Sequence, residues 1–197
     1  RETDFNFVSR LMEQEGIFYF FQHAAQSHTM VIADHAGAYV DCVEKEVVYP
    51  TTEGRVQIED HLTSWEHRYE FRSGKFTQTD YNFKTPEKNL STDSQTVVDL
   101  SDAKKYEIYD YPGEYETVDD GREDTNVRME EEEAGHDVVH ATSHCKSFTP
   151  GGKFKVKEHR SKSEQGKSFV ITAIHHHAVE PAQYETGQPG SAADYSN

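Results

Sequence analysis

The side chains of this chain that offer metal-binding or catalytic chemistry are its twelve histidines and two cysteines. His136, His140 and His144 are spaced by four, which on a helix would align three imidazoles on one face beside Cys145. Imidazole and thiolate are the usual ligands of zinc. The spacing therefore offers a zinc site, and with it a zinc-dependent hydrolase, only if this segment is helical.

Strand is the better interpretation of that segment, because Val138, Val139 and Thr142 favour β structure. A second group of histidines, at 175–177, ends a predicted strand, with His159 on a possible neighbour. Consecutive strand residues point to opposite faces, so at most two of the three imidazoles converge. We therefore predict no metal-ligating and no cofactor-binding residues.

Motifs for nucleophiles and phosphates are also absent from the sequence. Gly166, Lys167 and Ser168 resemble the end of a P-loop, but Ser161 stands where the first glycine belongs and a strand follows instead of a helix. There is no G-x-S-x-G or H-E-x-x-H motif, and 36 acidic residues make carboxylate pairs uninformative. We predict no catalytic residues and a protein that is not an enzyme.

Composition restricts the partners of the chain. A formal net charge of −16 on 197 residues repels phosphate backbones, so nucleic acid is not an expected partner. No apolar run approaches the roughly 20 residues that span a bilayer. Cys42 and Cys145 could pair, although two free thiols are the simpler expectation. Because Arg1 is not an initiator methionine, we expect a piece cut from a longer protein.

The pattern of apolar residues predicts a β-rich α+β chain with two helices. The first helix begins at Thr3 or Asp4 and ends before Gly16, with one apolar face made of Phe5, Val8, Leu11 and Met12. Residues 17–22 and 29–33 predict a hairpin, and the aromatic run 17–21 does not alternate, so we expect both its faces to be covered. The remaining predicted elements are a hairpin of residues 65–71 and 76–81, a helix at 121–135, and strands at 97–98, 106–111, 138–148, 153–157 and 169–174.

Two of these strands carry further predictions. Lys153, Lys155 and Lys157 alternate with apolar residues and indicate an edge strand, whose lysines either prevent aggregation or dock a neighbouring molecule. Residues 169–174 are almost continuously apolar and indicate a central strand. Beyond Val179 the sequence is rich in Pro, Gly, Ser and Ala and indicates a linker.

An ordered series of motifs resembles the hub region of VgrG, the spike protein of bacterial type VI secretion systems. The series covers residues 4 to about 195 and consists of DFNFVSRL at 4–11, EGI at 15–17, strands at 64–65 and 80–83 with Pro86, YPGEY at 111–115, an Arg/Glu-rich helix at 127–134, FTPG at 148–151 and FVITAIHH at 169–176. The resemblance implies a phage-tail-hub-like fold with a barrel-like antiparallel sheet module and an outer α/β module.

The resemblance also implies how the chain is divided and what it binds. Residues 1–55 and 90–135 would form the outer α/β module, residues 56–89 and 136–180 the barrel-like module that faces the tail tube, and residues 181–197 a linker toward the needle. The expected partners are two like subunits in a homotrimer, a hexameric tail-tube protein and baseplate proteins, with effectors or adaptors bound by other regions. Such a spike assembles in the bacterial cytoplasm and is then translocated. The alternative from the same class is the hub of a prophage or a related contractile injection particle.

Overall fold

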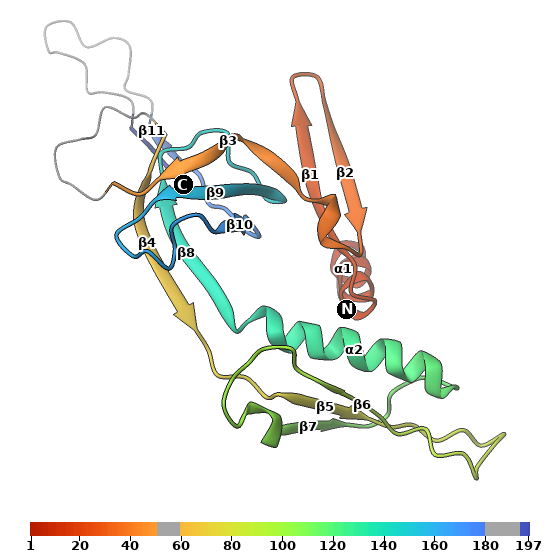
Figure 1. The fold of residues 1–197 in the computed structure, drawn as a ribbon. Helices are drawn as coiled ribbons and strands as arrows, with labels where there is room; N and C mark the ends of the chain where they lie inside the picture. Colours follow the sequence, from red (N-terminus) through yellow and green to blue (C-terminus); the bar gives the residue numbers. More distant parts are fainter. Residues whose placement is uncertain (51–59, 180–193) are drawn as a thin grey trace, which may run out of the picture. The chain divides into compact units, whose positions relative to one another are not determined.

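The computed structural model describes residues 1–50, 60–179 and 194–197. The chain divides into two compact units, Arg1–Phe18 with His67–Val139 and Tyr19–Glu66 with His140–Asn197. Each unit is therefore built from two separate stretches of sequence. The division falls inside two strands that pair with each other, β4 (Leu62–Tyr69) and β8 (Asp137–Ser143) (Figure 1).

The first unit packs one helix on a three-stranded sheet. The sheet has the order β6-β5-β7, in which β5 pairs antiparallel with β6 and parallel with β7. Helix α2 lies against β5 and β6. The elements are α1 (Asp4–Gln14), β5 (Lys75–Gln78), β6 (Thr92–Gln95), the short 3-10 helix η2 (Ala103–Lys105), β7 (Glu107–Asp110) and α2 (Val118–Ala134).

Helix α1 begins where its sequence predicts, whereas α2 begins at Val118, three residues before the predicted start at 121. The hydroxyl oxygen of Thr3 accepts a hydrogen bond from the backbone N–H of Asn6, and that of Thr117 accepts one from Asp120. Such caps satisfy N–H groups that have no partner within the helix. Gly16 follows α1 with a φ of 68°, the left-handed conformation expected just after a helix end.

Tyr115 connects α2 to the sheet in the first unit. Its buried hydroxyl lies 3.0 Å from the carbonyl oxygen of Gln78, which ends β5, and 2.7 Å from that of Leu90. The ring rests directly on Gly121 of α2, where an added Cβ would lie 2.4 Å from a ring carbon. Any larger residue at position 121 would therefore push the ring out of its place.

The second unit holds a projecting hairpin and a three-stranded sheet (Figure 1). The hairpin is β1–β2, and the sheet has the order β10-β9-β3, with β9 antiparallel to β10 and parallel to β3. Strands β11 and β12 form a further antiparallel pair. The elements are β1 (Phe18–Ala24), β2 (Ser27–Ala33), the 3-10 helix η1 (Ala36–Ala38), β3 (Val40–Val48), β9 (Gly152–Glu158), β10 (Ser168–Val170), β11 (His177–Val179) and β12 (Asp194–Ser196).

One face of the β10-β9-β3 sheet forms the core of the second unit. The core consists of Cys42, Val47, Leu62, Cys145, Phe148, Phe154 and Val156. Phe148 stacks on Phe154 with ring centroids 4.9 Å apart. Gly151 enters β9 with a φ of 81° and lies against the ring of buried Phe20. This position requires glycine both for its backbone conformation and for the space that the ring occupies.

The β-rich α+β class is confirmed, with two α-helices in the described part of the chain. The hairpin of residues 17–33 is also confirmed. The sheets are smaller and more mixed than predicted, because among the described residues each holds two or three strands, two pairs are parallel and none closes into a barrel.

Four local predictions are wrong. Residues 65–71 and 76–81 do not form a hairpin, since β4 pairs with β8 while β5 pairs with β6 and β7. The strand predicted at 97–98 lies at 92–95 instead, and Val97 is exposed. The central strand of the second unit is the lysine-bearing β9, whereas the apolar 169–174 contributes only the short outer strand β10. The reason is that lysines on one face leave both backbone edges of a strand free to pair.

The aromatic run of β1 also departs from its prediction. Phe20 is buried, but Phe21 is more than a third exposed, so only one face of the run is covered. Within the stretch predicted as a linker, Asp194–Ser196 forms β12 and the backbone of Asn197 pairs with that of Ser143. The rest of that stretch before Asp194 lies outside the described residues.

The contact between Tyr115 and Gly121 predicts a destabilised Gly121→Ala variant. Alanine favours a helix over glycine by about 1 kcal/mol, but the clash with a buried ring costs about 2–3 kcal/mol. Urea unfolding followed by circular dichroism should therefore show a net loss of stability. The control is Asn126→Ala, an exposed position on the same helix, which should keep or slightly raise stability. Equal effects of the two substitutions would contradict the packing described.

Candidate interaction surfaces

The histidines spaced by four do not form a metal site. His140 lies within strand β8 and His136 immediately precedes that strand, which is not helical. In extended chain, residues four apart are separated by about 13 Å, too far for two imidazoles to reach one ion. The Nδ1 of His136 lies 2.6 Å from the carbonyl oxygen of Glu70, and that of His144 lies 2.6 Å from the carbonyl oxygen of Tyr195. These imidazoles take part in structural hydrogen bonds.

The other candidate histidines are also dispersed among structural contacts. His159 stacks on Tyr49 and meets Trp65 edge to face, with ring centroids 5.0 and 5.4 Å away. His176 lies 2.6 Å from the hydroxyl of Tyr195 through its Nδ1. Across residues 1–50, 60–179 and 194–197, no group of three or more His, Cys, Asp or Glu is arranged to hold a metal ion.

Both cysteines are free thiols in the core of the second unit. Burial, reinforced by the negative charge of Glu44, raises the pKa of Cys42 to about 11. Burial also raises the pKa of Cys145 to about 11, against a lowering contribution from Ser143. A thiol with such a pKa is protonated near neutral pH and is a poor nucleophile.

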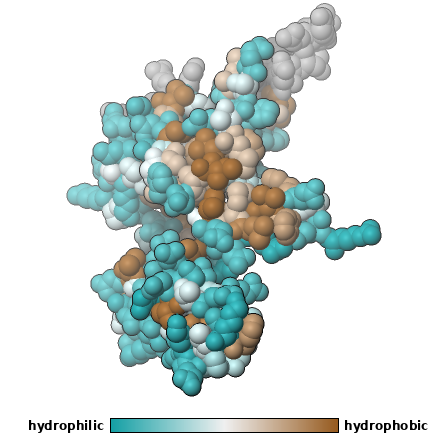
Figure 2. All heavy atoms as spheres, turned by 90° about the vertical axis from the view of Figure 1, so that its right-hand side faces the viewer, coloured by the Kyte–Doolittle hydropathy of each residue, from teal (hydrophilic) through white to brown (hydrophobic). Residues whose placement is uncertain are grey.

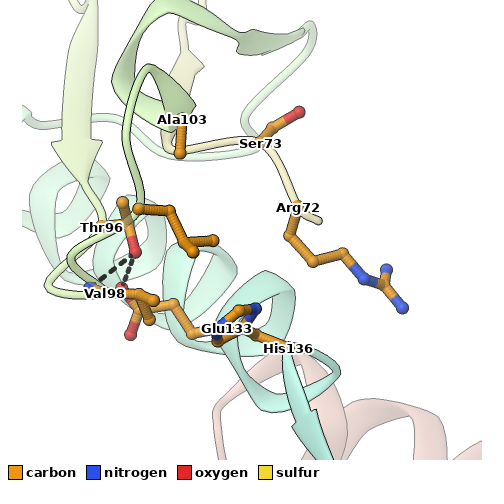
Figure 3. A pocket seen from close by; sticks show the side chains of 8 residues that line it. Arg72, Ser73, Thr96, Val98, Ala103, Glu133 and His136 are labelled. Carbon is orange, nitrogen blue, oxygen red and sulfur yellow. Dashed lines mark hydrogen bonds between the residues drawn. The ribbon is translucent and has the colours of Figure 1, made fainter. Parts of the chain in front are cut away.

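A small pocket in the first unit has no room for a substrate. Its accessible volume is about 10 Å³, enough for about one water molecule. Figure 3 shows its lining, where the hydroxyl of Thr96 donates a 2.6 Å hydrogen bond to the Glu133 carboxylate and accepts one from the N–H of Val98. The same carboxylate also accepts a 2.7 Å bond from the N–H of Val97. Glu133 thus holds a loop to α2, which is a structural role.

Hairpin β1–β2 has one buried and one exposed face. Phe20 lies buried against Gly151 and Tyr39. On the opposite face Phe21 contacts the rings of Tyr19, His23 and His28. Because strand residues alternate, Met30 and Ile32 of β2 share this outward face with His28, and they are 40% and 58% exposed. We call Tyr19, Phe21, Met30 and Ile32 the hairpin face.

The hairpin face is apolar on a mostly hydrophilic molecule. Figure 2 shows areas of brown hydrophobic surface among teal hydrophilic side chains. Exposed apolar residues gathered on one strand face are typical of contacts with another protein. The dense aromatic run of residues 17–21 is the sequence signal for this surface, although it predicts a strand covered on both faces and only one face is covered.

Helix α1 adds a second set of exposed apolar side chains, in the first unit. The helix is amphipathic as predicted, yet none of its residues is buried. Val8 and Leu11, one turn apart, are 49% and 41% exposed. The apolar face predicted from the sequence is therefore real, but in this chain it is largely open to solvent.

Charge is distributed unevenly over the described surface. Helix α2 presents exposed carboxylates at Asp119, Asp120, Glu123, Glu130 and Glu131. Strand β9 presents exposed lysines at 153, 155 and 157 on the face away from the core. An acidic and a basic surface on one chain can attract each other in different copies of the molecule.

A model of the phage tail baseplate hub family (GPD) matches residues 1–182. Since this match covers most of the chain, the chain belongs to the phage tail baseplate hub family. It is 34% identical over its whole length to the type VI secretion system spike protein VgrG1b of Pseudomonas aeruginosa and 32% identical to VgrG1a of the same organism. It spans only 26% and 30% of these two relatives.

Two more distant relatives place the chain in the same structural group. The actin cross-linking toxin VgrG1 of Vibrio cholerae is 25% identical over the whole chain, which spans 18% of that protein. The crystal structure of the 43 kDa tail protein of prophage MuSo2 from Shewanella oneidensis superposes with a TM-score of 0.57. The superposed region covers 87% of this chain and 49% of the tail protein, with 13% sequence identity. This similarity supports the fold alone.

The comparisons confirm the family predicted from the motifs. Neither α-helix in the described residues is long and apolar enough to cross a membrane.

The raised thiol pKa values lead to a prediction about reactivity. The folded chain should react with a disulfide reagent such as DTNB at pH 8 far more slowly than the urea-unfolded chain, because burial suppresses the thiolate. Two thiols should then be titrated after unfolding. Rapid reaction of either cysteine in the folded chain, followed by absorbance, would contradict the buried and protonated state.

Proposed function

We propose that this chain is the structural hub portion of a type VI secretion spike. In this role three subunits associate and join the tail tube and the baseplate to the membrane-puncturing needle that delivers effectors. The observation that carries the proposal is the 32–34% identity to type VI spike proteins along the whole chain. A prophage hub is the less favoured alternative, because the prophage tail protein shares the fold at only 13% identity.

A mechanical role fits the surfaces of the chain better than a chemical one. His136, His144, His159 and His176 take part in hydrogen bonds or ring packing, both cysteines lie in the core, and the small pocket holds about one water molecule. By contrast, the hairpin face exposes apolar side chains whose burial would contribute about 25 cal/mol for each Å² removed from water. The proposed hub itself therefore performs no catalysis, and any enzymatic extension would belong to another region.

The proposed assembly is a closed ring of three subunits. Threefold contacts are heterologous, so one patch of each subunit meets a different patch of the next. A stable ring should bury well over about 1,000 Å² for each subunit. In this arrangement residues 56–89 and 136–180 would contribute the surface toward a hexameric tail tube, and residues 1–55 and 90–135 the outer surface toward the baseplate.

Location follows from the same role. The hub would assemble with its tube and baseplate in the bacterial cytoplasm and leave the cell with the needle. Effectors or adaptors would attach through regions other than this chain, and no binding of nucleic acid and no stable membrane insertion are expected from it. The net charge of −16 agrees with that expectation, since it disfavours contact with phosphate-rich surfaces.

The oligomeric state tests the proposed function. A spike protein that carries this chain as its hub should give three times the subunit mass in light scattering. The 197-residue chain alone should give a single 22.6 kDa subunit, because it holds only part of the interface. A monomeric spike protein would contradict the proposal, and a trimer of the 197-residue chain would contradict the partial interface.

The hairpin face should be needed for assembly and not for folding. Phe21→Glu combined with Ile32→Glu places two charges on this face, and each substitution should change stability by less than about 0.5 kcal/mol because both sites are exposed. In bacteria that use the spike, release of the tail-tube protein into the medium should fall by about tenfold or more, which corresponds to about 1.4 kcal/mol lost from assembly.

The matched control is Gln22→Glu, an exposed position that alternation places on the other side of the same strand. This variant should release the tail-tube protein at the unmodified rate. Normal release by the double variant would exclude the hairpin face from the assembly.

A further inference from the structure

Strand β9 concentrates positive charge in a strongly acidic chain. Residues 153–167 hold six of the 20 lysines and arginines together with two glutamates, so this stretch carries +4 and the remaining residues −20. On the sheet itself, Lys153, Lys155 and Lys157 project from the outer face while Phe154 and Val156 enter the core. We call the outer face of the β10-β9-β3 sheet the lysine face.

The usual structural reasons for such lysines do not apply. Lysines on an edge strand prevent unwanted pairing of its free backbone groups. Strand β9 is central, hydrogen-bonded to β3 on one side and to β10 on the other, and needs no such protection. Protection of an edge therefore does not explain these lysines, which leaves solvation of an open sheet face and docking of a neighbouring molecule as their possible roles.

Acidic residues on β3 neutralise the lysine face only in part. Lys153 lies 3.5 Å from Asp41, and Lys157 lies 3.7 Å from Glu46. Lys45 adds another positive charge beside Asp41, at 3.4 Å. Exposed pairs at these distances contribute at most about 1 kcal/mol each. Four lysines against two carboxylates leave a net charge of +2 on the face.

In the described parts of the chain, strand β9 packs mainly against its two neighbours in the sheet. These neighbours are β3 and β10, and Val43, in the stretch of β3 between Asp41 and Glu46 where the pairing with β9 is irregular, is 82% exposed. Parallel strand pairs such as β3–β9 are usually covered on both faces, whereas here one face is open. A charged rim around exposed apolar side chains is the usual composition of a protein–protein contact.

The acidic surface of α2 is a complementary partner. Glu123 and Glu130 are exposed on one stripe of this helix, seven residues apart, with Asp119 on the same stripe. Asp119, which also pairs with Arg122, and Glu123 are four residues apart, about 6 Å along the helix, and Glu123 and Glu130 are seven residues apart, about 10.5 Å. Lysines on alternate strand residues repeat at about 6.6 Å, or about 13 Å over two repeats. The two rows of charge can therefore lie side by side and meet at more than one point.

We propose that the lysine face of one subunit docks on the acidic stripe of α2 in a second copy of this chain. The inference rests on the proposed function, because it names a contact within the hub trimer. The contact is heterologous, since it joins strand β9 of one subunit to helix α2 of the next, and such contacts are the kind that close a threefold ring.

Zero-length cross-linking in the assembled spike tests the contact. Carbodiimide joins a lysine to a carboxylate only where the two touch, and mixed ¹⁴N- and ¹⁵N-labelled subunits identify links between copies by mass spectrometry. We expect links from Lys153, Lys155 or Lys157 to Glu123 or Glu130 of another copy. Raising the salt before cross-linking should lower their yield, because the charges are exposed and screened.

Charge exchange makes the test decisive. Glu123→Lys with Glu130→Lys leaves both surfaces positive, and Lys153→Glu with Lys155→Glu and Lys157→Glu leaves both negative. Either set should raise the protein concentration at which half of the trimer dissociates by about tenfold, as expected for reversed interface charges. Combining the two sets restores opposite charges, so it should restore the trimer. It should also produce cross-links in which the lysine stands at position 123 or 130 and the carboxylate at position 155.

The control changes the same number of lysines elsewhere. Lys88→Glu, Lys104→Glu and Lys146→Glu are exposed, match the charge change and should leave dissociation unaltered. Two outcomes would overturn this contact and leave the proposed hub intact. In the first, the wild-type trimer forms but its lysine face links only to other sites or to another protein. In the second, the combined variant assembles no better than either single set. A wild-type spike that is not a trimer would remove both proposals.

Discussion

The alternation of strand β9 is the constraint on which the second unit depends. Successive strand residues point to opposite faces, so Phe154 and Val156 enter the core while Lys153, Lys155 and Lys157 must remain in solvent. A slip of one residue in pairing would bury three lysines and expose both apolar side chains. The pairing of β9 with β3 and β10 is therefore strongly determined, and the same register that builds the core also displays the basic surface.

In the first unit, an aromatic ring fixes the position of helix α2 on the sheet. Tyr115 occupies the space left by Gly121 of α2, and its hydroxyl reaches backbone carbonyls in the sheet layer. Thr92 and Thr125 complete this buried polar contact with a 2.7 Å hydrogen bond between their hydroxyls. Helix α2 is acidic and has few apolar side chains, so this specific packing compensates for the small hydrophobic contribution of the helix.

Both units leave surfaces that a self-sufficient globule would not need. The hairpin face exposes Phe21, Met30 and Ile32, and α1 buries none of its residues. The lysine face and the acidic stripe of α2 carry opposite charges. Apolar burial would contribute most of the binding free energy, whereas complementary charge would select the correct neighbour and register. This division of roles suits a hub whose task is to connect other subunits.

Several features of this protein follow from the sequence by itself. The periodicity of α1, the hairpin of β1 and β2, the lysine alternation of β9 and the order of the hub motifs identify the α+β class and the family, because each depends on neighbours along the chain. The histidine spacing at 136–144 indicates a zinc site only if the segment is a helix. The β propensity of the neighbouring residues already predicts a strand there.

Tertiary structure alone decides which strands pair and which apolar faces stay open. Strands β4 and β5 are near in sequence yet belong to different sheets, and β9 is central although its lysines suggest an edge. Backbone pairing is set by contacts between residues far apart, such as β3 with β9, and no local pattern encodes them. Phe20 and Phe21 are chemically identical neighbours that alternation places on opposite faces, and the packing of Gly151 and Tyr39 on one face makes Phe20 core while Phe21 stays at the surface.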